Sequence, residues 1–160
     1  MVTPDWLKKI DVFKGLTDEQ YEKIASACGE MNYKQGEFVT RKGDPSNALY
    51  ILAEGACDVK VELGRYSQFT VHQLNPGDVF GELGFIDAKP RSADIICVRP
   101  SKIVVLLRDE LMKLAEDDPK LGFTLIMRLA KKICERLRRT NEQFQNFYLK
   151  ASVVFKEMFR

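Results

Sequence analysis

The sequence predicts a mainly β fold with flanking helices, in which a small antiparallel barrel or jelly roll precedes one long C-terminal helix. Three observations support this prediction. Short runs of β-branched or alternating residues, separated by turn residues, fill the region between residues 30 and 108. Helical patterns occupy the stretches before and after that region. Many short strands punctuated in this way are typical of a small barrel or jelly roll.

The N-terminal stretch, residues 4–29, has a helical pattern. Thr17 has an N-cap side chain, and Gln20 follows it by three residues, as in a capping box. Gly29 is expected to end the helical stretch. An apolar stripe predicts that the stretch packs against the rest of the domain; its members are Leu16, Tyr21, Ile24 and Ala25.

The β region is divided by turn residues into short predicted strands. These strands are 38–40, 49–52, 57–63, 69–71, 95–98 and 103–107. The turn signals are Gln35-Gly36, Gly43-Asp44-Pro45, Glu54-Gly55, Gly64, Asn75-Pro76-Gly77-Asp78 and Arg99-Pro100. Only residues 81–86 interrupt the strand pattern.

The C-terminal part returns to helix. Asp109 is expected to cap a short helix that runs through Ala115. The pair Asp118-Pro119 is a strong start signal for a second helix over 119–158, which would be about 60 Å long. We therefore expect two parts, a β domain with its N-terminal helices over 1–116 and a long helix over 117–160.

The long helix carries apolar residues whose spacing alternates between four and three. They are Ile126, Ala130, Ile133, Leu137, Thr140, Phe144, Phe147, Ala151, Val154 and Met158. This heptad seam favours a parallel coiled coil between two copies of the chain, a homodimer through 126–158. The alternative is a single amphipathic helix that lies on its own β domain. Phe144 and Phe147 favour the dimer, because they would form a large exposed patch in a monomer.

Composition narrows the functional class. The 160 residues are 45% hydrophobic, enough for one well-cored domain and an appended helix. A formal charge of +2, from 25 basic and 23 acidic residues, argues against a dedicated nucleic-acid binder.

No apolar run approaches the roughly 20 residues that span a bilayer, and no signal peptide is visible. The cysteines Cys28, Cys57, Cys97 and Cys134 are scattered among apolar neighbours, which predicts buried, reduced thiols and a cytoplasmic protein.

Two kinds of chemistry find no support in the sequence. Metal sites in small β-rolls need two or three histidines with an acid, and His72 stands alone, so we expect no metal. No nucleophile–base pair or pair of carboxylates stands out, so we do not expect an enzyme.

Residues 80–94 combine groups suited to a small phosphate-bearing ring. Gly81 lets the backbone approach a ligand closely. Glu82 offers an acceptor for a sugar hydroxyl, and the next residues can form a helical turn whose free N–H groups face an anion. Arg91 supplies a planar cation with parallel donors, and Ser92 adds a hydroxyl. Taken singly, such a Gly-Glu pair is usually a turn and such an arginine a solvated surface charge.

The segment closely resembles the phosphate-binding cassette of cyclic nucleotide-binding domains, in its two halves Phe80-Gly81-Glu82-Leu83-Gly84 and Pro90-Arg91-Ser92-Ala93. Further matches lie upstream, at Gly43-Asp44, Leu49-Tyr50-Ile51-Leu52, Glu54-Gly55 and Pro76-Gly77-Asp78. The resemblance covers roughly residues 5–150. It implies a β-roll with an inserted helical turn.

The same resemblance implies roles for individual residues. Glu82 would bind the ribose 2′-hydroxyl, and Arg91 would bind the cyclic phosphate. The phosphate would also meet the backbone N–H groups of Gly81, Glu82 and Leu83 and the hydroxyl of Ser92.

The long helix resembles the dimerisation helix of the bacterial catabolite activator family. In that family the residue that matches Thr140 bonds the adenine amino group, and the next residue of the partner subunit does the same. Here that next residue is Asn141 and not serine, so the preference between cAMP and cGMP stays open. The family continues into a helix-turn-helix domain, whereas this chain stops at Arg160; we do not expect sequence-specific DNA binding.

The sequence therefore predicts a cytoplasmic sensor that binds a cyclic nucleotide, with cAMP favoured over cGMP, and signals through its C-terminal helix as a homodimer. Two alternatives stand beside it. One is a ligand-free β-roll scaffold that recruits partners through the coiled coil. The other is the detached sensory part of a transcription regulator.

Overall fold

The computed structural model describes residues 2–62 and 68–158, and for 153–158 it describes the backbone alone. The chain forms two compact units, Met1–Leu125 and Ile126–Arg160. The helical elements are α1 (Pro4–Leu7), the 3-10 turn η1 (Asp11–Phe13), α2 (Asp18–Ala27), α3 (Glu82–Asp87), α4 (Arg108–Asp117) and α5 (Pro119–Met158).

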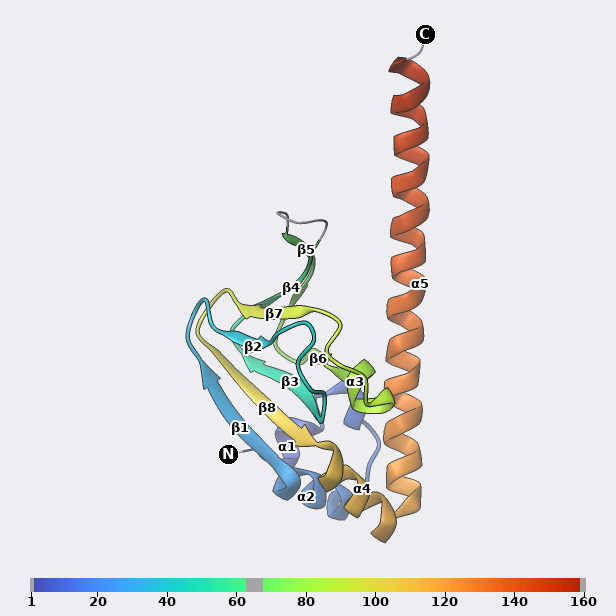
Figure 1. Cartoon of the computed structure of the whole chain (residues 1–160). Helices are drawn as coiled ribbons and strands as arrows, with labels where there is room; N and C mark the ends of the chain where they lie inside the picture. The colour runs from blue at the N-terminus through green and yellow to red at the C-terminus, as the bar shows by residue number, and fades with distance from the viewer. Residues whose placement is uncertain (1, 63–67, 159–160) are drawn as a thin grey trace. The chain divides into compact units, whose positions relative to one another are not determined.

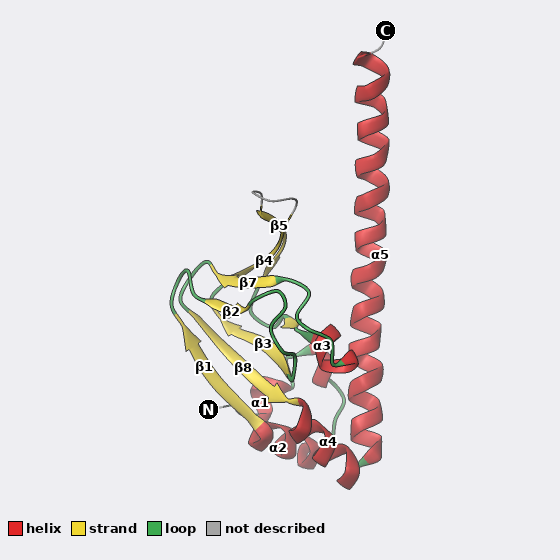
Figure 2. Cartoon of the chain, viewed as in Figure 1, coloured by secondary structure: helices red, strands yellow, loops and turns green. Residues whose placement is uncertain are grey.

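Two four-stranded antiparallel sheets form the body of the first unit (Figures 1 and 2). The first sheet has the order β1 (Cys28–Tyr33), β8 (Ser101–Leu107), β3 (Ala48–Glu54), β6 (Val79–Phe80). The second has the order β2 (Phe38–Thr40), β7 (Asp94–Cys97), β4 (Cys57–Glu62), β5 (Gln68–Leu74). One cluster of buried side chains draws on both sheets: Leu52, Cys57, Leu74, Phe80, Ile95, Cys97 and Ile103. The sheets therefore share one core, and the predicted β-roll with flanking helices is confirmed.

Each strand predicted from the sequence falls on a strand of the structure, as far as the described residues reach. The run predicted over 57–63 is β4, which ends at Glu62. Its last residue and the turn predicted at Gly64 lie outside the described residues.

Two strands have no counterpart in the prediction. β1 is exposed along most of its length, so it shows no alternation of apolar and polar residues. Its antiparallel pairing with β8, from Cys28 opposite Leu106 to Tyr33 opposite Ser101, makes it a strand. β6 has only two residues and pairs with Tyr50 and Ile51 of β3. Both strands are defined by pairing with residues that are distant in the sequence. A local sequence pattern therefore does not indicate them.

The N-terminal helical stretch is broken into α1, η1 and α2. The predicted capping box is present: the Gln20 N–H donates to Thr17 Oγ1 at 3.2 Å, and the Thr17 N–H donates to Gln20 Oε1 at 3.0 Å. The predicted end at Gly29 is wrong. α2 ends at Ala27, the backbone of Cys28 is already extended, and Gly29 pairs with Val105 inside β1.

The two C-terminal helices begin differently. α4 begins at Arg108, and its N-cap residue Leu107 makes no side-chain cap among the described contacts, so the predicted cap at Asp109 is wrong. Asp118 does cap α5, because its Oδ1 accepts the Leu121 N–H at 3.0 Å. α5 spans Pro119–Met158, as the sequence predicts.

Within the described residues, no helix has both the length and the apolar character to span a membrane.

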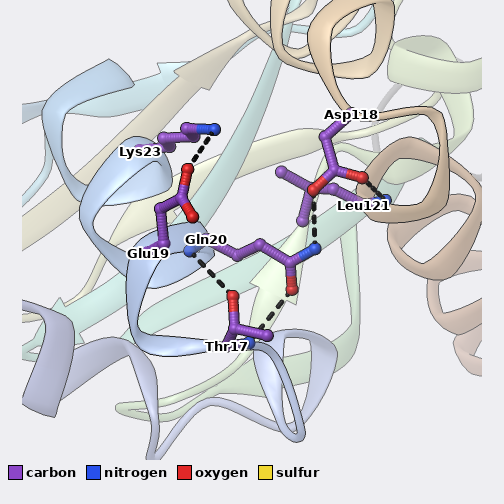
Figure 3. Close-up of polar contacts among 6 residues, drawn as sticks. All are labelled: Thr17, Glu19, Gln20, Lys23, Asp118 and Leu121. Carbon is purple, nitrogen blue, oxygen red and sulfur yellow. Dashed lines mark hydrogen bonds and ion pairs between the residues drawn. The ribbon is translucent and has the colours of Figure 1, made fainter.

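A single glutamine joins the caps of α2 and α5 (Figure 3). Gln20 Nε2 donates to Asp118 Oδ2 at 2.7 Å while its Oε1 accepts the Thr17 N–H. The Gln20 bond, followed by the Leu121 N–H and the nearby Lys23 charge, lowers the pKa of Asp118 below its usual value. The ionised carboxylate is therefore favoured in the folded protein.

The contact between Gln20 and Asp118 should make a contribution to stability that depends on pH. A carboxyl group whose pKa is lower in the folded than in the unfolded chain stabilises the fold above its unfolded pKa, and the contribution disappears as the pH falls through the folded pKa. Gln20→Ala should therefore lower the free energy of unfolding most at neutral pH, and the deficit should shrink below about pH 4. Urea titrations from pH 7 to pH 3 measure it.

Thr17→Ala is the matched control for Gln20→Ala. It removes one half of the capping box and leaves the Gln20–Asp118 bond in place. Its deficit should stay constant over the same pH range. A Gln20→Ala deficit that is equally constant would contradict the assignment of the Asp118 shift to Gln20.

The cysteines depart in part from the prediction. Cys57 and Cys97 are buried, and they are directly paired on β4 and β7 with their sulfurs 3.5 Å apart. Burial raises the pKa of the Cys57 and Cys28 thiols to about 12, so both are protonated. All four thiols are free, but Cys134 is exposed on α5, so the expectation that every cysteine is buried is wrong.

Candidate functional site

The site begins at Gly81, where the chain leaves β6 and enters the short helix α3. Gly81 has φ +77°, a left-handed conformation that favours glycine. A Cβ at this position would lie 2.5 Å from Arg91 Nη1 and 3.1 Å from Tyr50 Cδ2. Both backbone conformation and space therefore require glycine here, and the absence of a side chain lets Arg91 approach the backbone.

Arg91 is a buried arginine, with only 6% of its surface exposed. Its Nη1 donates to the Gly81 carbonyl at 2.9 Å and its Nη2 to the Ala48 carbonyl at 2.7 Å. The guanidinium also lies 4.9 Å from the centroid of the Tyr50 ring, which stacks on Phe80. The guanidinium carries more N–H donors than these two bonds use. Both of these hydrogen bonds go to neutral backbone carbonyls.

The loop that contains Gly43 and Asp44 holds the backbone of Arg91. The Arg91 N–H donates to the Asp44 carbonyl at 2.9 Å, and the Gly43 N–H donates to the Arg91 carbonyl at 2.9 Å. The Gly-Asp pair upstream of the cassette thus positions the arginine through main-chain bonds.

Glu82 is the first residue of α3 and is almost completely buried, with 2% of its surface exposed. A carboxylate in the first turn of a helix is stabilised by the positive end of the helix dipole. None of the described side chains caps this helix end. The cassette therefore contains a buried acid, which follows Gly81 in the sequence, and a buried base, which hydrogen-bonds the Gly81 carbonyl.

The other predicted cassette residues lie at the surface. Leu83 has 44% of its surface exposed, and Ser92 is exposed. Of the predicted set in this unit, Glu82 and Arg91 are buried, and Arg91 contacts the half-buried Gly81. Leu83 and Ser92 flank them on the outside.

Arg108, at the start of α4, belongs to this region although no sequence motif predicted it. Its Nε donates to the Phe85 carbonyl at 2.7 Å, and its Nη2 donates to the Ser46 carbonyl at 3.1 Å and to the Gly84 carbonyl. Arg108 thus binds carbonyls in the last turn of α3. No local pattern marks this role, because every one of these partners lies at least 23 residues away in the sequence.

Thr140 and Asn141 belong to the second unit. Both are exposed, and the Thr140 hydroxyl donates to the Arg136 carbonyl at 3.0 Å, one turn earlier in α5. The structure does not group them with the cassette residues. Their proposed contact with the base stays a prediction.

The predicted seam of α5 is half-buried at Ala130 and Ile133 and exposed further along the helix. Leu137, Phe144 and Phe147 have 58%, 67% and 70% of their surfaces exposed. The side chains of Val154 and Met158, two further members of the seam, lie outside those described. An exposed row of this kind is unusual in a soluble monomer.

Comparison with known proteins gives a consistent result. The sequence model of the cyclic nucleotide-binding domain matches residues 30–118, more than half of the chain. The chain is 27% identical to a cAMP-dependent protein kinase regulatory subunit of Dictyostelium discoideum, over 89% of this chain and 40% of that protein. It is 28% identical to a CRP-like cAMP-activated global transcriptional regulator of Mycobacterium tuberculosis, over 95% of this chain and 63% of that protein.

A solved structure of a domain from Methylobacillus flagellatus, described as a cyclic nucleotide-binding domain, superimposes with a TM-score of 0.78. The match has 26% sequence identity and covers 87% of this chain and 78% of that one. The chain spans less than two thirds of the length of either curated relative.

Proposed function

The chain belongs to the cyclic nucleotide-binding domain family, and on this premise we propose that it is a regulatory sensor that binds cAMP in the cassette of residues 80–94. The β-roll with its N-terminal helices, residues 1–116, would hold the ligand. The helix over 117–160 would carry the signal. The proposed activity is binding and not catalysis, and the proposed compartment is the cytoplasm.

The buried guanidinium of Arg91 is the observation that carries this proposal. A buried cation is costly unless a partner compensates it, and its described partners are neutral carbonyls. A cyclic phosphate supplies the missing negative charge in a geometry that matches the planar fork of arginine. The N–H groups in the first turn of α3 are further donors for the same anion. Glu82 is the acceptor that we propose to bind the ribose hydroxyl.

The choice of cAMP over cGMP rests on the relatives. Two of them carry cAMP in their names, a protein kinase regulatory subunit and a transcriptional regulator. Thr140 and Asn141 of α5 are the residues we propose to contact the base.

Isothermal titration and thermal unfolding with cAMP and with cGMP test the proposal. Ligand at 100 times its dissociation constant should stabilise the protein by about 2.7 kcal/mol. The expected result is binding of both nucleotides, with cAMP tighter. A protein that gains no stability from either nucleotide at millimolar concentration would be a ligand-free scaffold, and the proposal would be wrong.

Glu82→Ala should weaken cAMP binding by about 1.5–3 kcal/mol, because a hydrogen bond to a charged group is lost. The matched control is the ligand 2′-deoxy-cAMP, which lacks the hydroxyl that Glu82 would bind. The substitution should change its affinity little. Equal losses for the two nucleotides, measured by calorimetry, would contradict the ribose role of Glu82.

We propose that the chain is a homodimer through the seam of α5. The exposed aromatic side chains Phe144 and Phe147 support this proposal. Two copies that pair along the seam would cover the apolar row and place Thr140 and Asn141 of each copy at the interface.

Phe147→Ser should raise the dissociation constant of this dimer by about tenfold or more, equivalent to a loss of about 1.4 kcal/mol. Leu149→Ser is the matched control, because Leu149 is similarly exposed, at 62%, but lies off the seam. Light scattering across a dilution series measures both variants. A protein whose wild-type form is monomeric at every concentration would not use the seam in this way.

A further inference from the structure

Tyr50 of β3 lies where the two halves of the cassette meet. The Arg91 guanidinium lies over its ring, 4.9 Å from the ring centroid. A Cβ added at Gly81 would lie 3.1 Å from Tyr50 Cδ2, so the same ring also borders Gly81. The Gly81 carbonyl in turn accepts a hydrogen bond from Arg91 Nη1. One aromatic side chain therefore borders both the glycine and the arginine of the cassette.

The strand that carries Tyr50 supplies a second contact to the arginine. Arg91 Nη2 donates to the carbonyl of Ala48, two residues before Tyr50. β3 lies between β8 and β6 in its sheet, and Tyr50 is paired with Phe80 of β6 and with Val105 of β8. The Ala48 carbonyl and the Tyr50 ring thus belong to one segment that is fixed by strand pairing on both sides.

The ring is held in place by a second aromatic side chain. Tyr50 and Phe80 stack, with their ring centroids 5.3 Å apart and an angle of 18° between the ring planes. Phe80 belongs to the buried cluster that joins the two sheets, and Tyr50 packs against the same cluster. The ring of Tyr50 therefore connects the shared core to the guanidinium of Arg91.

A ring in this position acts on a guanidinium in two ways. The electron-rich face of an aromatic ring attracts a cation, and the attraction is stronger where water is excluded. The ring also restricts the rotations of a long side chain that otherwise has many rotamers. Together with the two carbonyls, it fixes the Arg91 guanidinium through contacts with the protein alone. A donor group that is ordered in this way loses less conformational entropy when a ligand binds.

We propose that Tyr50 is a positioning residue for Arg91: its ring holds the guanidinium in the orientation that receives an anion, so that the ligand meets a preformed cationic site. This inference rests on the proposed binding of a cyclic nucleotide through Arg91. It assigns the role to the aromatic ring of Tyr50 and not to its hydroxyl. The affinity that the ring adds comes from the ordering of Arg91 that the ligand no longer has to impose.

Calorimetry with cAMP on two variants of Tyr50 tests the role of the ring. Tyr50→Leu removes the ring and should raise the dissociation constant by about 2- to 12-fold, the cost of ordering one long side chain on binding. Tyr50→Phe keeps the ring and should bind as the wild type does. A Tyr50→Leu variant that binds as tightly as the wild type would contradict the inference, and so would a Tyr50→Phe variant that binds as weakly as Tyr50→Leu.

Tyr33→Leu is the matched control for Tyr50→Leu. Tyr33 is also half-buried and packs against the same buried cluster, but its described contacts do not include Arg91. Its substitution should lower the unfolding temperature and leave the affinity for cAMP unchanged. An equal loss of affinity in the two leucine variants would show that general destabilisation, and not the position of the ring, causes the effect.

The NMR signal of the Arg91 Nε–H separates positioning from general stability, and its measurement needs no ligand. The signal that disappears in Arg91→Lys identifies it. Relaxation measurements should show an ordered Nε–H in the wild-type protein, in Tyr50→Phe and in Tyr33→Leu. In Tyr50→Leu the same group should be mobile.

The outcomes distinguish this inference from the proposed function. An Arg91 Nε–H that stays ordered in Tyr50→Leu, in a protein that binds cAMP, would overturn the inference and leave the proposed function intact. Absence of binding by both cAMP and cGMP would overturn both proposals. If Tyr50→Leu does not fold, the ligand-free wild-type protein decides the question. An ordered Nε–H with a nuclear Overhauser effect to the Tyr50 ring supports the inference, and a mobile one overturns it.

Discussion

Arg91→Ala is expected to weaken cyclic nucleotide binding by about 2–5 kcal/mol, the cost of removing one partner from a desolvated charge pair. The large effect follows from the burial of the guanidinium, which is only 6% exposed. Competing water and counterions are excluded there, so an anion bound to it interacts in a medium of low effective dielectric. Isothermal titration with cAMP measures the loss.

The prediction needs a stability control, because the hydrogen bonds of Arg91 also stabilise the folded protein. Its removal leaves the carbonyls of Gly81 and Ala48 without these donors. Arg91→Lys retains the positive charge but not the planar fork, so it should bind more weakly than the wild type and more tightly than Arg91→Ala. The unfolding temperature of each ligand-free variant shows how much of the loss comes from the fold. An Arg91→Ala variant that folds and binds with unchanged affinity would refute the phosphate role of Arg91.

Gly81→Ala is expected to lower the free energy of unfolding by about 2–5 kcal/mol and to reduce ligand binding strongly. About 1–2 kcal/mol comes from forcing a side chain into the left-handed conformation. The rest comes from overpacking, because the added methyl group would lie 2.5 Å from Arg91 Nη1. Relief of that contact requires Arg91 to move away from the Gly81 carbonyl, which displaces the proposed phosphate-binding group. Urea denaturation and calorimetry measure the two effects.

Gly36→Ala is the matched control for Gly81→Ala. Gly36 has φ +85°, a similar conformation, but an added Cβ would meet no atom within 4 Å. This substitution should therefore cost only the free energy of the unfavourable backbone conformation. The difference between the two variants isolates the contact with the site.

A double-mutant cycle tests the mechanism of the Gly81 effect. In an Arg91→Ala background the methyl group of Ala at position 81 no longer meets a guanidinium, so Gly81→Ala should cost about as much as Gly36→Ala. The expected coupling between the two positions is about 1–3 kcal/mol. Additive effects of the two substitutions would show that the methyl group does not act through Arg91.

Local patterns predicted those parts of the fold whose cause is local. The capping box at Thr17 and Gln20 and the N-cap at Asp118 are formed by residues three positions apart, so a short segment contains all of their partners. The strands with β-branched or alternating residues were equally visible; β3, β7 and β8 bury several of these residues, whereas β5 is exposed except at Leu74.

The wrong predictions share a different cause. Gly29 resembles a helix end, yet pairing with Val105 draws it into a strand. Asp109 resembles a cap, yet α4 begins one residue earlier, at Arg108. In both cases contacts with residues far away in the sequence overrode a local preference that is worth only about 1 kcal/mol.

Three properties of this protein could be read from its residues without coordinates: the family, the six strands with a β-branched or alternating pattern together with the long C-terminal helix, and the presence of an acid and an arginine in one cassette. They were readable because motif spacing and side-chain periodicity are properties of neighbouring residues. Folding in three dimensions was needed to show that the distant carbonyl of Ala48 holds Arg91 and that Arg108 binds the far end of α3. Folding in three dimensions was also needed to show that Cys57 and Cys97 are in contact in the core. These contacts join residues 23 to 43 positions apart, and they exist only after the strands have paired and the two sheets have closed on each other.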